Sequence, residues 1–263
     1  MHLLDFRKGK ISYSDRGKGR AIVLIHGFLG NKSLWKTHVA ALKQSFRVIC
    51  IDLPGHGASD TFGYIHSMEL MGDAVKAVLN HLKIRKVVLV GHSLGGYVAL
   101  AFAEKYPDSV SGLIMINSTA QGDSNAKKKS RNQLLELLKQ DREKALKLLV
   151  PNFFTYKTRT THWKIKQYLK AATQCSAKGI AATIEGMKKR KEREIVLHFS
   201  PFPYLYLIGL YDAVLDNKQQ EKEMNMSESG SGVLFENSSH MIYLEEPDKS
   251  IRMIKKFVKK LMN

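Results

Sequence analysis

The stretch Gly91-His92-Ser93-Leu94-Gly95-Gly96 follows the apolar run 86–90 and opens a helical pattern that stops before Pro107. A G-x-S-x-G pattern between a strand and a helix predicts a sharp turn with a nucleophilic serine, Ser93, at its tip. The turn is so tight that Gly91 and Gly95 must lack side chains. We expect a strained backbone at Ser93, with its hydroxyl above the carboxyl edge of a sheet.

Short apolar runs recur on both sides of this turn, and each ends at glycine or polar residues. Such runs are typical of strands that are buried on both faces. The predicted strands are 11–15, 21–25, 46–51, 86–90, 112–116, 204–208 and 233–235. Helical periodicity is found at 68–82, 96–106 and 251–262. Because strands and helices alternate, the sequence predicts an α/β fold with a mostly parallel sheet and helices on both faces.

Residues 124–200 interrupt this alternation. The pattern there predicts helices over 127–149, 162–172 and 176–190, and no strand-like run occurs before Ile195-Val196. We therefore expect an α/β core made of residues 1–123 and 201–263, with residues 124–200 inserted as a helical lid.

The composition is that of a globular protein, since 44% of the 263 residues are hydrophobic and 25% are charged; this excludes a disordered or fibrous chain. The two cysteines, Cys50 and Cys175, have no zinc-ligand spacing, so neither a disulfide framework nor a structural zinc site is expected. A reducing compartment fits best. The first residues contain no signal-peptide core, and no apolar run approaches the ~18 residues of a membrane span. We expect a cytoplasmic protein without membrane insertion.

The formal net charge is +18, and residues 124–200 alone hold 19 Lys and Arg against 6 Asp and Glu. Because the excess is local rather than uniform, nucleic-acid binding is not expected. Two interpretations stay open: a solvated helical face, or a docking surface for an acidic carrier protein or an anionic substrate. The candidate docking residues are Lys127, Lys128, Lys129, Arg131, Lys188, Lys189, Arg190 and Lys191.

Several further motifs accompany the Ser93 turn, and in their order and spacing the chain resembles the α/β-hydrolase family along nearly its whole length. The motifs are His26-Gly27-Phe28, Asp52-Leu53-Pro54-Gly55-His56-Gly57-Ala58-Ser59, Asn117-Ser118-Thr119-Ala120, Gly209 with Asp212, and His240 followed by Glu245-Glu246-Pro247. The resemblance implies an eight-stranded, mostly parallel sheet with a helical cap and a Ser–His–Asp triad.

The residues themselves also point to a triad. A serine hydroxyl needs a base to take its proton, and a carboxylate must orient that base. In the chain order Ser, acid, His, the base is His240, because no other histidine lies beyond residue 198. Asp212 directly follows a predicted strand and is the candidate acid; Asp216 is the alternative. Asn117, at the end of an earlier strand, cannot serve as the acid.

A negatively charged tetrahedral intermediate needs hydrogen-bond donors, and two backbone N–H groups are candidates. One belongs to Leu94, directly after the serine, and the other to Phe28, in the loop after the strand 21–25. We expect His26, His56 and His92 to be structural.

A serine at this position favours acyl transfer to water, from an ester, a thioester or a lactone. Epoxide hydrolases and haloalkane dehalogenases of the family carry aspartate there, so Ser93 argues against both. Carbon–carbon bond hydrolases, cofactor-free perhydrolases and the menaquinone-pathway lyase use the same triad. The lyase usually carries an arginine shortly after the serine, where this chain has Tyr97. A non-catalytic ligand-binding protein is a further alternative.

Aromatic residues of the predicted lid, namely Phe153, Phe154, Tyr156 and Trp163, either line an acyl pocket or pack the lid on the core. No phosphate loop, nucleotide fingerprint or metal cluster is visible, so no cofactor or metal is expected. We expect a small-molecule acyl ester or thioester substrate and a monomer or small homo-oligomer.

Overall fold

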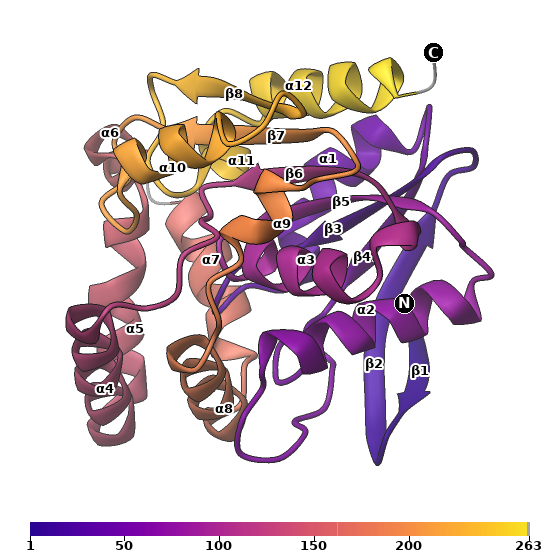
Figure 1. The fold of residues 1–263 in the computed structure, drawn as a ribbon. Helices are drawn as coiled ribbons and strands as arrows, with labels where there is room; N and C mark the ends of the chain where they lie inside the picture. The colour runs from indigo at the N-terminus through magenta and orange to yellow at the C-terminus, as the bar shows by residue number, and fades with distance from the viewer. Residues whose placement is uncertain (162, 262–263) are drawn as a thin grey trace.

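The computed structural model describes residues 1–161 and 163–261. In this part of the chain, eight strands form one sheet in the order β1-β2-β4-β3-β5-β6-β7-β8 (Figure 1). The strands are β1 (His2–Phe6), β2 (Gly9–Arg16), β3 (Ala21–Ile25), β4 (Arg47–Ile51), β5 (Val87–His92), β6 (Val110–Ile116), β7 (Tyr204–Gly209) and β8 (Gly230–Phe235). Only the β1–β2 and β2–β4 pairs are antiparallel. The predicted mostly parallel α/β sheet is confirmed.

The strands could be predicted from the sequence because most of them are buried. Every residue of β3, β5 and β7 is buried, so these strands are continuous apolar runs. The strand that the sequence did not predict, β1, lies at the edge of the sheet and is partly exposed. Its mixed sequence, HLLDF, carries no such run.

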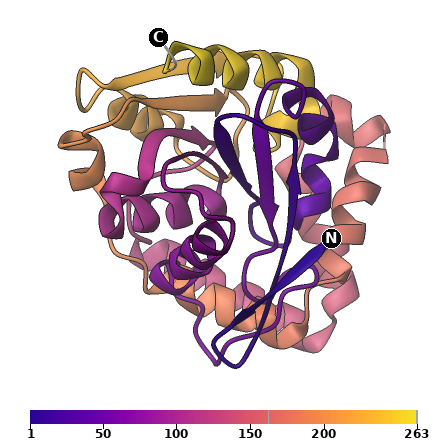
Figure 2. The same cartoon turned by 90° about the vertical axis from the view of Figure 1, so that its right-hand side faces the viewer.

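Helices cover both faces of the sheet. α2 (Met68–His81) and α3 (Leu94–Lys105) pack on one face, and α1 (Lys36–Leu42) and α12 (Pro247–Lys260) lie on the other (Figure 2). α10 (Asn217–Met224) packs on β7 and β8, and α11 (Ile242–Glu245) precedes α12. α12 buries Ile251, Ile254 and Val258 and exposes lysines, which agrees with a final helix packed on the core. The predicted end of that helix, residue 262, lies outside the described residues.

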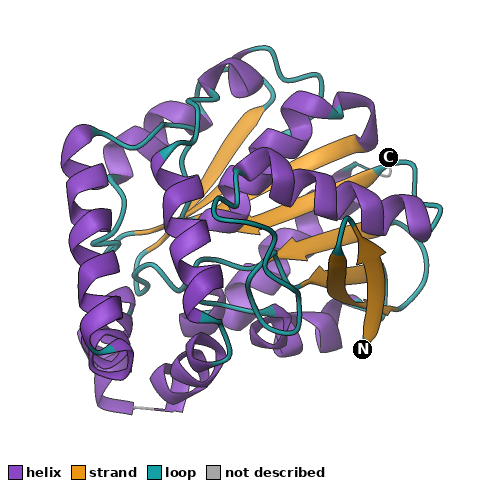
Figure 3. Ribbon diagram, turned by 90° about the horizontal axis from the view of Figure 1, so that it is seen from below, coloured by secondary structure: helices purple, strands orange, loops and turns teal. Residues whose placement is uncertain are grey.

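The chain between β6 and β7 is helical, as predicted. It contains α4 (Asn125–Gln140), α5 (Arg142–Leu149), α6 (Tyr156–Thr161), α7 (Trp163–Thr173) and α8 (Ala177–Lys188). These helices gather beside the end of the sheet toward which β7 and β8 point (Figures 1 and 3). Residue 162, the predicted start of one helix, lies outside the described residues.

One expectation for this segment is wrong, and one pair with a strand-like sequence is helical. The single helix predicted over 127–149 is two helices, because Asp141 adopts an extended backbone and its side chain accepts a hydrogen bond from the Lys144 N–H at 3.0 Å, capping α5. The strand-like pair Ile195-Val196 lies in the short helix α9 (Glu194–His198), where Ile195 is exposed. No helix in the described ranges is long and apolar enough to cross a membrane.

Candidate active site

Ser93 stands in the turn between β5 and α3 with a positive φ of 50°, as the glycine pattern predicted. A Cβ on Gly91 would lie 2.4 Å from the Gly95 carbonyl oxygen, and one on Gly95 would lie 2.3 Å from the Ile25 carbonyl oxygen. Both positions therefore exclude any side chain. The hydroxyl of Ser118 donates to the Ser93 carbonyl oxygen at 2.8 Å, which stabilises the strained turn.

The parallel register brings the ends of β3, β5, β7 and β8 to one edge of the sheet, and the loops that follow carry the predicted residues. His240 Nδ1 lies 2.8 Å from Asp212 Oδ2, and both side chains are almost fully buried. Asp212 Oδ1 accepts hydrogen bonds from the N–H groups of Val214 and Leu215, at 2.7 and 3.2 Å. The carboxylate is thus held on both oxygens, and its position favours the Nδ1–H tautomer of His240.

Asp216, the alternative acid, does not contact His240. It is the N-cap of α10, where its side chain accepts a hydrogen bond from the Lys218 N–H at 2.9 Å. The structure therefore brings Asp212, and not Asp216, together with the histidine.

Asn117 connects three parts of this edge, a role that sequence reasoning missed. It follows β6 with a positive φ of 40°. Its Nδ2 donates to the Ser239 carbonyl oxygen at 2.7 Å, and its Oδ1 accepts from the Gly209 N–H at 2.8 Å. Asn117 thereby fixes the end of β7 against the residue that precedes His240. The signal in the sequence was an asparagine directly after a strand, a residue that tolerates this backbone conformation.

The backbone N–H groups of Phe28 and Leu94 donate to no protein acceptor in the described residues. Phe28 lies in a turn closed by the Gly30 N–H and the Gly27 carbonyl, 3.0 Å apart, and the next residue, Leu29, has a φ of 63°. The Phe28 carbonyl oxygen accepts the hydroxyl of Tyr168, on α7, at 2.5 Å. Both amides are free donors beside Ser93, one of them at the start of α3.

Three buried histidines hold the loops around Ser93. His26 donates from Nδ1 to the Gly27 carbonyl at 2.8 Å and accepts the Leu53 N–H on Nε2 at 3.0 Å. His92 donates from Nε2 to the carbonyl of His240 at 2.8 Å. His56 Nδ1 lies 3.1 Å from the Pro54 carbonyl. Burial lowers the pKa of His26, His56 and His92, so these rings are neutral groups that pack and hydrogen-bond.

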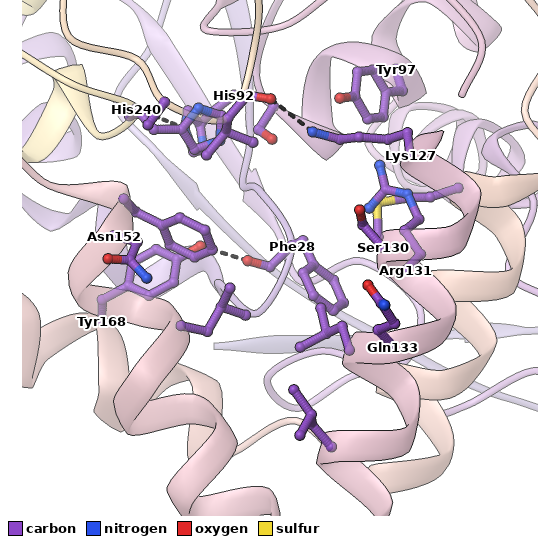
Figure 4. A pocket seen from close by; sticks show the side chains of 18 residues that line it. Phe28, His92, Tyr97, Lys127, Ser130, Arg131, Gln133, Asn152, Tyr168 and His240 are labelled. Atoms are coloured by element: carbon purple, nitrogen blue, oxygen red, sulfur yellow. Dashed lines mark hydrogen bonds between the residues drawn. The ribbon is translucent and has the colours of Figure 1, made fainter. Parts of the chain in front are cut away.

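A cavity of about 460 Å³ opens in front of Ser93 and His240 (Figure 4). Most of its wall is apolar or aromatic, from Phe28, Tyr97, Leu134, Leu137, Leu149, Phe153, Tyr168, Met187, Ala213 and Val214. Its polar lining comes from Ser93, Lys127, Ser130, Arg131, Gln133 and Asn152, with His92 and His240. This apolar cavity with few polar groups suits a small organic ligand.

The four aromatic residues of the predicted lid differ in their environment. Phe153 lines the cavity. Phe154 is buried against the Tyr168 ring, and Tyr156 and Trp163 are exposed to 82% and 60%. Only Phe153 of the four is therefore placed to contact a ligand in this cavity.

The basic residues of the segment also divide into two kinds. Arg131 and Arg190 both pair with the buried carboxylate of Asp123, and Lys188 pairs with Glu185 at 2.7 Å. In contrast, Lys128, Lys129, Lys189 and Lys191 are exposed. Among residues 1–161 and 163–261, no group of three His, Cys, Asp or Glu side chains is arranged to hold a metal ion.

The sequence and the fold are similar to those of known proteins. The chain belongs to the α/β-hydrolase fold family, whose model matches residues 20–247. It is 29% identical over 258 residues to the AB hydrolase superfamily protein YisY of Bacillus subtilis, covering 92% of this chain and 93% of that protein. A pimeloyl-[acyl-carrier protein] methyl ester esterase of Vibrio vulnificus is 24% identical over 257 residues, covering 95% and 98%. A solved thermophilic esterase from Thermogutta terrifontis has a TM-score of 0.92 at 29% identity, covering 97% of this chain and 95% of its own.

Proposed function

We propose that the protein is a serine hydrolase that cleaves carboxylic esters or thioesters through an acyl-enzyme intermediate. The observation that carries the proposal is the Asp212–His240 pair, whose histidine lines one cavity with Ser93 and Phe28. Asp212 holds Nδ1 of His240, which leaves Nε2 as the nitrogen that can take a proton. Ser93 is then the nucleophile, His240 the general base, and Asp212 the residue that orients it.

The proposed reaction has two halves. The Ser93 oxygen attacks the acyl carbonyl carbon while its proton passes to His240 Nε2, and the developing oxyanion accepts hydrogen bonds from the N–H groups of Phe28 and Leu94. The alcohol or thiol departs with the proton from His240. Water then attacks the acyl-serine ester with His240 as base, which releases the acid and restores Ser93.

The serine and the histidine must form a hydrogen bond for this reaction. In the described residues, no hydrogen bond joins Ser93 Oγ to His240 within 3.5 Å. Catalytic hydrogen bonds are often long in the absence of substrate and shorten in the reacting complex. We infer that an acyl group in the cavity draws the Ser93 hydroxyl toward His240.

The similarity to the Thermogutta terrifontis esterase supports an ester substrate. We assign residues 1–123 and 201–263 to the catalytic core and residues 124–200 to a lid, because helices of this segment supply Leu134, Phe153 and Tyr168 to the cavity wall. The name of the Vibrio vulnificus relative adds a second candidate within the same chemistry, an ester linked to an acidic carrier protein. The exposed lysines Lys128 and Lys129 are the proposed contacts for such a partner.

The proposal is tested with a short nitrophenyl ester under rapid mixing. The wild-type protein is expected to release a burst of nitrophenol equal to the concentration of active sites, followed by slower turnover. Ser93→Ala should abolish both phases, since the hydroxyl is the nucleophile, whereas Ser45→Ala in an exposed turn should leave them unchanged. Turnover by Ser93→Ala at a tenth of the wild-type rate would refute the assignment.

A further inference from the structure

The side chain of Lys127, which ends in an ammonium group, lines the cavity. It lies in the first turn of α4, where its backbone N–H donates to the capping Ser124 hydroxyl at 3.2 Å. Its side chain is half-buried and extends across the cavity toward the side where His92 and His240 lie (Figure 4). Nζ donates to the Val214 carbonyl oxygen at 2.8 Å, in the loop that begins with Asp212. A lysine ammonium has three N–H donors, so this contact leaves donors for a ligand.

The charges around this ammonium are unbalanced. Within the described ranges, no carboxylate lies within 4.0 Å of Lys127 Nζ. The nearby Asp123 is already paired with both Arg131 and Arg190, so that wall of the cavity carries an excess of positive charge. Burial and the Arg131 charge lower the pKa of Lys127, as expected for a cation that is desolvated without a close counterion. An anion bound in the cavity would remove that penalty.

The remaining wall of the cavity indicates the chemical character of the rest of the ligand. Leu134, Leu137, Leu149 and Phe153 surround the cavity and suit an aliphatic chain. The cationic donors near Lys127 that could hold a second negative charge are limited, because only Arg131 of the two arginines lines the cavity and its Nε and Nη2 both donate to Asp123. A singly charged carboxylate therefore fits better than a phosphate dianion.

We propose that the cavity selects ester substrates that carry a free carboxylate, such as monoesters of aliphatic dicarboxylic acids, and that Lys127 binds this carboxylate. This inference rests on the proposed esterase function and names its substrate class. A purely structural role for Lys127, in which it fastens α4 to the 212–215 loop, makes a different prediction. Loss of such a contact would lower the turnover of charged and neutral esters alike.

The test compares monomethyl adipate with dimethyl adipate, which differ in one carboxylate, with the released acid measured by chromatography. In Lys127→Met, the ratio of kcat/KM for the charged ester to that for the neutral ester should fall about tenfold or more, mainly through KM. Lys127→Arg, which keeps the charge, should retain part of the preference. Lys139→Met is the matched control, because Lys139 lies on the same helix, exposed and paired with Glu136. Equal losses for both esters in Lys127→Met, or an unchanged ratio, would overturn the proposal.

A binding experiment separates this inference from the proposed reaction. Calorimetric titration of Ser93→Ala with monomethyl adipate should show binding that Ser93→Ala/Lys127→Met weakens about tenfold. Binding that depends on Lys127, with no hydrolysis by the wild-type protein, would refute the esterase function and retain the carboxylate site. Hydrolysis of the neutral ester with binding independent of Lys127 would refute the carboxylate site alone.

Discussion

Tyr168 donates its phenolic hydroxyl to the backbone carbonyl of Phe28 at 2.5 Å. Tyr168 is on α7, whereas Phe28 lies in the turn after β3, so a helix of the proposed lid holds the turn that carries one of the two proposed oxyanion donors. Burial raises the pKa of Tyr168 well above its ordinary value, which keeps the hydroxyl protonated and able to donate. In the proposed mechanism, the segment 124–200 therefore positions an oxyanion donor as well as forming part of the cavity wall.

The first prediction follows from this contact. Tyr168→Phe should lower kcat for a neutral nitrophenyl ester roughly tenfold, because complete loss of an oxyanion donor costs more than displacing one. The melting temperature should change little, since the ring still packs on Phe153 and Phe154. Tyr64→Phe, at a fully solvated position, is the control. Unchanged turnover in Tyr168→Phe would show that the turn holds its geometry without the hydroxyl.

The second prediction concerns the two candidate carboxylates. Asp212→Asn should lower kcat by about four orders of magnitude, because an amide favours the wrong tautomer of His240. Asp216→Asn should have little effect on activity, since asparagine is as good an N-cap for α10 as aspartate. Steady-state kinetics of the two variants side by side is the measurement. A larger loss in Asp216→Asn would reverse the assignment.

The third prediction concerns stability in acid. His38 is fully buried, with Nε2 2.8 Å from the Ser250 hydroxyl, and burial lowers its pKa to about 3. The unfolded chain binds this proton near pH ~6.5 and the folded protein does not, so stability falls as the pH drops below that value. Between pH 7 and 5, this residue alone should lower the free energy of unfolding by about 2 kcal/mol.

Urea unfolding at several pH values measures this effect. The dependence of the free energy of unfolding on pH should be shallower in His38→Gln by about that amount, even though the variant is less stable at pH 7. Identical pH dependence in His38→Gln and the wild-type protein would mean that the folded protein accommodates the charged ring.

The fourth prediction tests carrier-protein docking. If Lys128 and Lys129 meet an acidic carrier, kcat/KM for a carrier-linked ester should fall steeply with added salt, because exposed charges are screened beyond about 8–10 Å at physiological ionic strength. A neutral nitrophenyl ester should respond weakly. Lys128→Glu/Lys129→Glu should reproduce the loss at low salt. Equal salt responses for the two substrates would leave these lysines as solvated surface.

Much of the fold and of the candidate site could be predicted because the relevant signals are local. Strands buried on both faces are continuous apolar runs. Gly91 and Gly95 flank Ser93 because a Cβ at either position would lie within 2.4 Å of a backbone oxygen. The loops after parallel strands meet at one edge, so Ser93, Asp212 and His240 could be assigned to one place without coordinates.

The features that could not be predicted depend on contacts between residues that are far apart in the sequence. Asp123 is paired with Arg131, eight positions away, and with Arg190, 67 positions away, so two of the candidate docking arginines are committed to the interior. Arg193, also counted in the basic excess, is 2% exposed and pairs with Glu69 and Glu104. A count of charges cannot separate such buried pairs from a solvated surface.

In the proposed mechanism, Ser93 is the nucleophile and His240 activates it. This role is tested most directly by reacting the protein with an alkyl fluorophosphonate and locating the adduct by mass spectrometry of the digested chain. We predict one adduct per molecule, on the peptide that contains Ser93, with the rate of labelling sharply reduced in His240→Ala. An adduct on another residue, or labelling of Ser93 at the same rate without His240, would contradict the account.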